Sequence, residues 1–224
     1  MTRATVKPHL LFDLDGTLMD PAQGIIGSVR HALAALDATV PAFEALRWVI
    51  GPPLRPNFEK LLGGTKRVEE AIELYRVRYR GGAMFDAVVY AGIEEALVAL
   101  ARDRTLVLAT SKPHVLAKPI LAHFGLDRHF AAVHGAELDG RNDDKGDLIG
   151  HILETHAIDR TDALMVGDRK FDVLGASRHG IATIGVLWGH GDEDELSEAG
   201  AAALCRHPRE LPGLVSRHSR ATAR

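Results

Sequence analysis

A short apolar run that ends in two aspartates marks the first clear element of the chain. Residues 9–12 (His-Leu-Leu-Phe) are too few for a helix, and their consecutive apolar side chains are typical of a strand buried on both faces of a parallel sheet. Asp13 and Asp15 follow this strand, and Gly16 then allows a sharp turn of the backbone. Because ligands bind at the carboxyl ends of strands in open α/β sheets, the two carboxylates are expected to lie in a binding site.

Two carboxylates this close raise each other's pKa, and a divalent cation removes that conflict. An oxygen-only site with few protein ligands suits Mg²⁺, which binds beside substrate phosphate. Taken alone, the motif also fits a capped turn, in which Asp precedes Gly. The start of a calcium loop is excluded, because nothing downstream supplies its oxygen spacing or its closing glutamate.

Composition narrows the class of protein. The 224 residues can form one large domain or a domain with an insert, and 46% of them are hydrophobic. The net charge of −3 gives no basic field, so we expect neither nucleic acid nor an anionic membrane as a partner. The sequence leaves the oligomeric state open between a monomer and a homodimer. Cys205 is the only cysteine, which fits a reducing compartment. No apolar run approaches the roughly 20 residues of a membrane span, and the N-terminus does not resemble a signal peptide, so we expect a cytoplasmic location.

The pattern along the chain changes from helical to alternating. Apolar spacing and Gly or Pro stops predict helices at about 21–36, 44–50, 55–62 and 67–80, with no strand in residues 20–86. Beyond Tyr90, strands are predicted at 105–109, 130–133, 163–166 and 182–187, with helices at 92–102, 114–124, 146–156 and 171–178. Alternating units of this kind predict an α/β fold with a doubly wound parallel sheet. We expect residues 1–19 and 87–216 to form this core, 20–86 a helical insert, and 217–224 a frayed tail.

Three further groups at strand ends or helix starts carry suitable chemistry. Thr110 and Ser111 follow the predicted strand 105–109 and can donate hydrogen bonds to a phosphoryl oxygen, although such residues also form ordinary turns. Lys145 precedes a helix and can neutralise phosphoryl charge, although a lone lysine is usually on the surface. Asp168 and Asp172 follow the strand 163–166, where they could also cap a helix or favour its dipole.

Together these motifs resemble the haloacid dehalogenase (HAD) superfamily of phosphatases. The resemblance rests on DLDGT (13–17), LATSK (108–112), Lys145 and GDRKFD (167–172), and it covers nearly the whole chain. The stretches Gly92-Ile93, 123–126 (HFGL), 137–140 (ELDG) and 185–189 (GVLWG) are similar to the phosphoglycolate phosphatase-like branch, in which some members are assigned as 5′-nucleotidases. The resemblance implies a Rossmann-type core and makes the helical segment 20–86 a cap domain.

The resemblance also implies roles for the residues. Asp13 would be the nucleophile that forms an aspartyl-phosphate, and Asp15 the general acid and base. Mg²⁺ would be held by Asp13, the backbone carbonyl of Asp15, and Asp168, while Asp172 supports the metal or the lysine from outside the ligand set. Thr110, Ser111 and Lys145 would hold the phosphoryl oxygens.

The implied activity is Mg²⁺-dependent hydrolysis of small phosphomonoesters, such as phosphoglycolate or nucleoside 5′-monophosphates. The carboxylate at Asp15 favours phosphoryl transfer, because the dehalogenases of the superfamily lack an acid there. Two alternatives remain: a sugar-phosphate mutase, which shares all four motifs, and a non-catalytic scaffold that keeps the fold. Intact Asp13, Asp15, Lys145 and Asp168 argue against the scaffold.

Three smaller expectations concern residues outside these motifs or at their edges. In the cap, the turn at 51–55 is a candidate specificity loop in which Arg55 could bind a substrate carboxylate or second phosphate, or the turn merely joins two helices. Arg169 replaces the small hydroxyl residue of many relatives, and its role is open. The twelve histidines form no metal-like pair with a third ligand, since His151 and His156 are five residues apart on a predicted helix. The turn 188–191 is expected to follow the last strand rather than to cradle phosphate.

Overall fold

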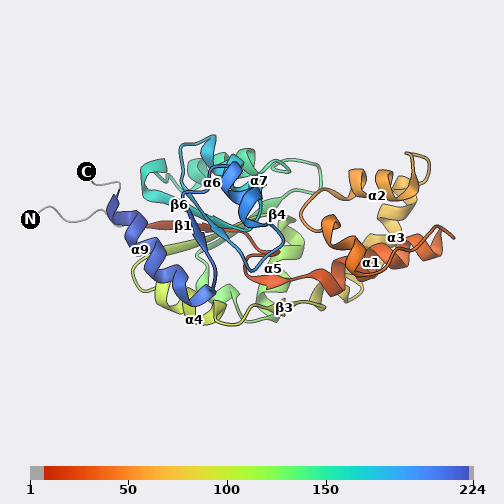
Figure 1. Ribbon diagram of the computed structural model, residues 1–224, viewed down its shortest axis with the longest axis horizontal. Helices are drawn as coiled ribbons and strands as arrows, with labels where there is room; N and C mark the ends of the chain where they lie inside the picture. The colour runs from red at the N-terminus through yellow and green to blue at the C-terminus, as the bar shows by residue number, and fades with distance from the viewer. Residues whose placement is uncertain (1–7, 222–224) are drawn as a thin grey trace, which may run out of the picture. The chain divides into compact units, whose positions relative to one another are not determined.

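The computed structural model of the protein describes residues 8–221, with residues 219–221 as backbone only (Figure 1). The chain forms two compact units, one built from the residues up to Met19 together with those from Val89 onward, and the other from Asp20–Val88. The chain passes from one unit to the other in β2 (Met19–Asp20) and returns in β3 (Val88–Val89). These two short strands pair with each other as a separate two-stranded sheet.

A six-stranded parallel sheet forms the centre of the first unit, in the order β5-β4-β1-β6-β7-β8. Its central strand β1 lies between β4 and β6, so a residue that follows β1 is flanked by both neighbours. The expected doubly wound α/β class is confirmed. The strands are β1 (His9–Phe12), β4 (Thr105–Pro113), β5 (Ala132–Ala136), β6 (Ala163–Gly167), β7 (Thr183–Val186) and β8 (Ala203–Cys205).

Helices cover both faces of this sheet. Figure 1 shows α6 and α7 on one side and α4 and α9 on the other. Such coverage leaves no face of the central strands in water, which explains their continuous apolar runs. The helices of this unit are α4 (Ile93–Leu100), α5 (His114–His123), α6 (Lys145–Thr155), α7 (Lys170–Ser177), α8 (Glu193–Glu198) and α9 (Leu211–Ala221).

The hydrophobic core between the sheet and α6 fixes the position of that helix and of its first residue. Leu10, Leu11 and Phe12 of β1 are all 0% exposed, and Leu11 faces a cluster that α6 completes with Leu148, Ile149 and Ile152. Burying each of these side chains stabilises the fold by about 1.5–3 kcal/mol. This packing holds α6 against the centre of the sheet, and with it the first residue of the helix, Lys145.

The second unit is helical, and the helical insert is thereby confirmed. It contains α1 (Ala22–Ala35), α2 (Leu54–Leu62) and α3 (Val68–Arg80). Aromatic rings of α2 and α3 meet in its core, where Phe58 and Tyr75 lie edge to face with centroids 6.3 Å apart. The helix predicted at 44–50 is instead a 3₁₀ helix, η1 (Glu44–Val49).

Two strand predictions need correction, and the short strands β2, β3 and β8 were not predicted. β4 continues through Thr110 and Ser111 to Pro113, with an irregularity in its pairing after Thr110, so the two hydroxyl residues lie within the strand and not after it. β5 begins two residues later than predicted, at Ala132, because Phe130 ends a 3₁₀ turn and packs edge to face on Phe12. β8 was not predicted, because three residues carry too little pattern.

The C-terminal segment is more ordered than predicted. The tail expected to fray from Arg217 is helical as far as Ala221, in α9. Val215 of this helix is fully buried and Leu211 is 1% exposed, so the helix is anchored by its apolar face. Residues 222–224 of the predicted tail lie outside the described residues.

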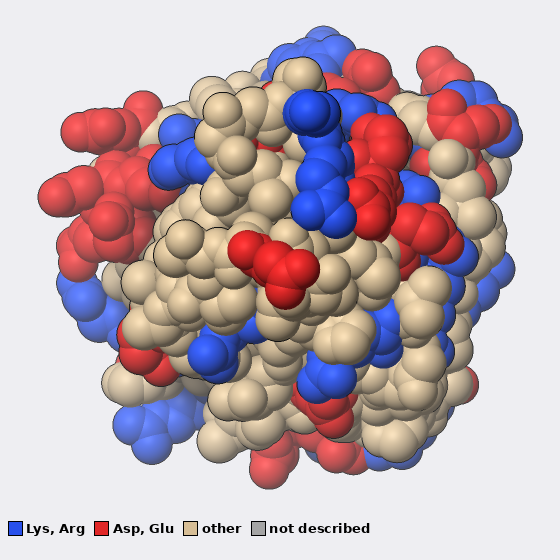
Figure 2. All heavy atoms as spheres, turned by 90° about the vertical axis from the view of Figure 1, so that its right-hand side faces the viewer, with Lys and Arg blue, Asp and Glu red and all other residues tan. Residues whose placement is uncertain are grey.

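The surface carries charges of both signs. Figure 2 shows Lys and Arg side chains interspersed with Asp and Glu on the face that it draws. Within the described part of the chain, no helix combines the length and the apolar character that crossing a membrane requires.

Candidate active site

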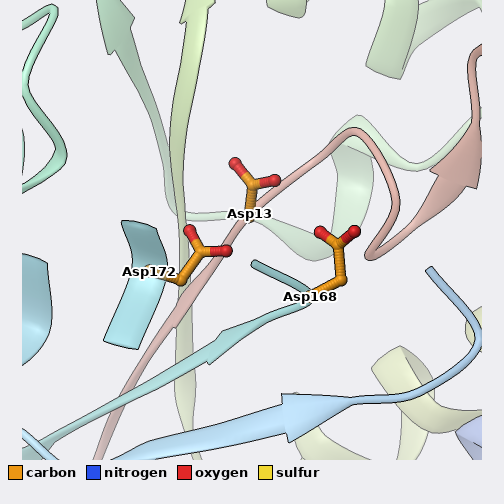
Figure 3. A group of neighbouring side chains, drawn as sticks. All are labelled: Asp13, Asp168 and Asp172. Atoms are coloured by element: carbon orange, nitrogen blue, oxygen red, sulfur yellow. The ribbon is translucent and has the colours of Figure 1, made fainter. Parts of the chain in front are cut away.

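The first two acidic motifs meet because their strands are neighbours. β1 and β6 pair with Phe12 opposite Val166, so Asp13 follows β1 close to where Asp168 follows β6. The backbone N–H of Asp13 donates to the carbonyl of Val166 at 3.0 Å. In Figure 3 the carboxylates of Asp13, Asp168 and Asp172 point toward one another, and one oxygen of each lies within 4.8 Å of the others.

Lys145 is the cation of this cluster. Its Nζ lies 2.7 Å from Asp13 Oδ1 and 2.8 Å from Asp172 Oδ1, and it donates to the carbonyl of Ala109 at 2.9 Å. Burial lowers the pKa of Lys145, but Asp13 and Asp172 outweigh it and hold the pKa above the usual value, so the side chain is an ammonium. Gly175 permits this position, since a Cβ there would come within 2.8 Å of the lysine side chain.

Asp168 is fully buried and held by two donors. Thr17 Oγ1 donates to its Oδ1 at 3.2 Å, and the backbone N–H of His190 donates to its Oδ2 at 2.8 Å. Burial raises its pKa well above the usual value, and the charges of Asp13 and Asp172 add to the effect. The ionised form of Asp168 is therefore costly unless further positive charge is present.

Asp172 lies in the first turn of α7. Its Oδ2 accepts the backbone N–H of Arg169 at 3.1 Å, which leaves Oδ1 for Lys145. Burial raises its pKa to about 6, against the opposing effect of Lys145. The carboxylate thus caps the helix and also forms an ion pair with Lys145.

Asp15 lies apart from this cluster and has its own partner. Lys112 Nζ lies 2.6 Å from Asp15 Oδ2, and both side chains are largely buried. Asp15 Oδ1 is buried and has no hydrogen-bond partner among the described residues. Burial raises the pKa of Asp15 despite the ammonium of Lys112. Lys112 lies within the LATSK motif, but its sequence position alone predicted no role for it.

The turn at Gly16 packs closely against Asp168, so the two acidic motifs are in contact. Gly16 has a φ of +86°, and a Cβ there would lie 2.1 Å from Asp168 Oδ2. Gly189 approaches from the other side, where a Cβ would lie 2.4 Å from both Asp168 Cβ and the Gly16 carbonyl. Trp188 Nε1 donates to the carbonyl of Thr17 at 2.9 Å. The turn at 188–191 therefore packs on the acidic cluster.

The other residues predicted for the site are Thr110 and Ser111, and the role of Arg169 was left open. Thr110 is 1% exposed and its Oγ1 accepts the backbone N–H of Lys112 at 3.2 Å, whereas Ser111 is exposed. Arg169 is held at the start of α7 by Glu195, with Nε and Oε1 2.8 Å apart.

Arg55 belongs to the helical unit. It forms an ion pair with Glu69 of the same unit, and its side chain is 58% exposed. The ion pair joins α2 to the first turn of α3, so within this unit Arg55 already has a carboxylate partner.

The donor set fits a hard divalent cation. Three carboxylates lie close together with the ammonium of Lys145 in contact, and hard oxygen ligands suit Mg²⁺. The carboxylate of Asp15 lies outside this group, so its predicted contribution would come from its backbone carbonyl alone.

Comparison with known proteins identifies the family. Residues 10–186 match the haloacid dehalogenase-like hydrolase family. A 5′-nucleotidase from Pseudomonas aeruginosa is 45% identical over 213 residues, which cover 94% of this chain and 96% of that protein. A phosphoglycolate phosphatase from Agrobacterium fabrum is 33% identical over 200 residues, or 86% of this chain and 85% of that protein.

A solved structure of a relative shares the fold. Protein tyrosine kinase A of Mycobacterium tuberculosis superposes with a TM-score of 0.80 at 36% identity, over 93% of this chain and 97% of that one. The family match spans most of the chain, and the enzyme class predicted from the sequence is confirmed. The protein belongs to the haloacid dehalogenase-like hydrolases, and within them to the phosphoric monoester hydrolases.

Proposed function

We propose that this protein is a Mg²⁺-dependent phosphatase of small phosphomonoesters that works through an aspartyl-phosphate on Asp13. The observation that carries the proposal is the contact of Lys145 Nζ with Asp13 Oδ1 at 2.7 Å, beside the carboxylates of Asp168 and Asp172. This contact fixes one oxygen of Asp13 and leaves Oδ2 as the attacking atom. A carboxylate nucleophile divides one difficult displacement into two easier ones.

In the first step, a bond forms between Asp13 Oδ2 and phosphorus while the bond from phosphorus to the alcohol oxygen breaks. Asp15 donates its proton to that leaving oxygen. In the second step, water attacks phosphorus, Asp15 accepts a proton from the water, and the Asp13 carboxylate leaves. The raised pKa of Asp15 supports this role, because a general acid must hold its proton near the working pH.

Asp13, Asp168 and the backbone carbonyl of Asp15 would hold the Mg²⁺. When bound, this ion offsets the negative charge that the phosphate adds to the carboxylates. Asp172 would stay outside the ligand set and orient Lys145, with which it shares an ion pair at 2.8 Å. Lys145, Thr110 and Ser111 would hold the phosphoryl oxygens by charge and hydrogen bonds.

For the substrate we propose nucleoside 5′-monophosphates first and phosphoglycolate second. The order follows the 45% identity to the 5′-nucleotidase against 33% to the phosphoglycolate phosphatase. Residues 20–86 would act as a cap domain that selects the ester, because the groups around Asp13 bind only phosphate. Arg55 would leave Glu69 to bind the distal part of the substrate, since an exposed ion pair of this kind is worth at most about 1 kcal/mol.

Phosphate release from a panel of esters tests this proposal. The panel contains nucleoside 5′-monophosphates, phosphoglycolate and p-nitrophenyl phosphate, each assayed with Mg²⁺ and with EDTA. We expect release with Mg²⁺, none with EDTA, and a fall of about 10⁴-fold or more in Asp13→Asn, which keeps the acceptor for Lys145. Equal phosphate release by the wild type and by Asp13→Asn would contradict the assignment of Asp13 as the nucleophile. No phosphate release from any ester would favour the mutase or the scaffold.

A further inference from the structure

A pair of histidines lies apart from the acidic cluster. His134 on the edge strand β5 and His156 at the end of α6 bring their Nε2 atoms within 2.7 Å of each other. His151, on the same helix, is next to them, with its ring centroid 5.7 Å from that of His134. His134 is half-buried, whereas His151 and His156 are exposed, so the pair is reachable from solvent.

The contact needs a shared proton or a cation. Two imidazole nitrogens at 2.7 Å repel if both present lone pairs, so one of them must donate a proton to the other. A metal ion that accepts both lone pairs can replace this proton. Spacing along one helix could not predict this contact, because the two histidines lie on different elements.

The protonation state of His134 allows its imidazole to bind a metal ion. Burial, together with the neighbouring His156, His151 and Lys118, lowers its pKa to about 4. Its imidazole is therefore neutral at pH 7, which is the form that binds metal. Two metal–nitrogen bonds of about 2.0–2.1 Å at a tetrahedral angle place the two nitrogens roughly 3.3 Å apart. Side-chain rotations that move the nitrogens apart by about half an ångström would give this geometry.

We propose that Nε2 of His134 and Nε2 of His156 form a binding site for a borderline divalent transition metal such as Ni²⁺ or Zn²⁺. Water molecules complete the coordination. Imidazole prefers these ions to Mg²⁺, whereas the carboxylates around Asp13 prefer Mg²⁺. The site is therefore selective against the ion that the proposed activity uses, and it does not depend on that activity.

Calorimetric titration with Ni²⁺ tests this site. The protein carries no histidine tag and is held in excess Mg²⁺, so that the acidic cluster does not compete. We expect one Ni²⁺ per chain, and a loss of affinity of about tenfold or more in His156→Asn. His31→Asn, which changes an exposed histidine of α1, is the matched control and should bind as the wild type does.

Two further measurements keep the test decisive. His156 is exposed, so its substitution should leave the thermal unfolding of the metal-free protein unchanged even if His134→Asn does not fold. In wild-type protein, Ni²⁺ should broaden the imidazole NMR signals of His134 and His156 before those of His31. Unchanged affinity in His156→Asn, or equal broadening of all histidine signals, would overturn the proposal.

Discussion

Lys112 Nζ lies 2.6 Å from Asp15 Oδ2, and this contact divides the two oxygens of the carboxylate. One oxygen is held by a buried cation, while Oδ1 has no hydrogen-bond partner among the residues that the structure describes. An oxygen that is oriented but unpaired is suited to carry a proton to and from the substrate. Lys112 is thus the positioning residue for the general acid that we propose.

Lys112→Met should therefore slow proton donation more than binding. We expect kcat/KM for alkyl phosphates to fall by about 10²-fold, because the acid loses its orientation. For p-nitrophenyl phosphate, whose leaving group needs no proton, kcat/KM should change little, since this constant reports only the steps up to the phosphoenzyme. Lys112→Arg should keep much of the activity, and an equal loss for both esters would contradict the positioning role.

Lys145→Met should destabilise the metal-free protein. It leaves Asp13 and Asp172 buried without their cation, and removal of one partner from a buried pair costs about 3–5 kcal/mol. Denaturant unfolding in EDTA should show this loss, and Mg²⁺ should restore part of it. Lys66→Met, at an exposed position, should leave the unfolding free energy unchanged. A stability equal to wild type would mean that the carboxylates are not charged together.

The stability of the metal-free protein should decrease with rising pH. The pKa of Asp172 is raised to about 6 and that of Asp168 is also raised, so the folded state keeps protons that the unfolded state releases. The contribution of Asp172 is present below about pH 4 and is lost as the pH rises through about 6, and the contribution of Asp168 is likewise lost with rising pH.

Thermal unfolding in EDTA across this range measures the effect. We expect a falling Tm, a smaller fall in Mg²⁺ because the cation stabilises the ionised form, and a smaller fall in Asp168→Asn. A Tm that rises with pH in EDTA would show that the acidic cluster is ionised without a metal.

Gly189→Ala should damage the site through packing alone. The new Cβ would lie 2.4 Å from Asp168 Cβ, and relief of such a contact costs about 1–3 kcal/mol. We expect a Tm below that of wild type and a higher Mg²⁺ concentration for half-maximal activity. Gly64→Ala has no atom within 4 Å of its Cβ and serves as the control. If the activity of Gly189→Ala depended on Mg²⁺ concentration as that of the wild type does, the turn would not contribute to the Mg²⁺ site.

The sequence predicted the parts of the site that lie at strand ends. The run at residues 9–12 identifies a buried strand, and Asp13 therefore lies at the carboxyl end of that strand. The same pattern places Asp168, so the meeting of the two acids follows from strands β1 and β6 being neighbours. Lys145 was predicted from its position before a helix, although only the packing of α6 shows which carboxylates it contacts.

Other features could not be predicted, because they depend on contacts between distant segments. Gly189 indicates a turn and nothing more until its packing against Asp168 is seen. His134 and His156 lie on different elements, and no periodicity relates an edge strand to the end of a helix. The role of Lys112 depends on the continuation of β4 beyond Thr110, where hydroxyl residues suggested that the strand ends.

The phosphorylation state of Asp13 during turnover tests the central claim most directly. Asp15→Asn lacks the base for the second step, so reaction with p-nitrophenyl phosphate should stop at the phosphoenzyme after one burst of p-nitrophenol. Mass spectrometry of the quenched protein should then find one phosphoryl group on the peptide that contains Asp13, and none when Asp13→Asn is added. A burst without a phosphorylated Asp13 would contradict the account and would point to direct attack by water.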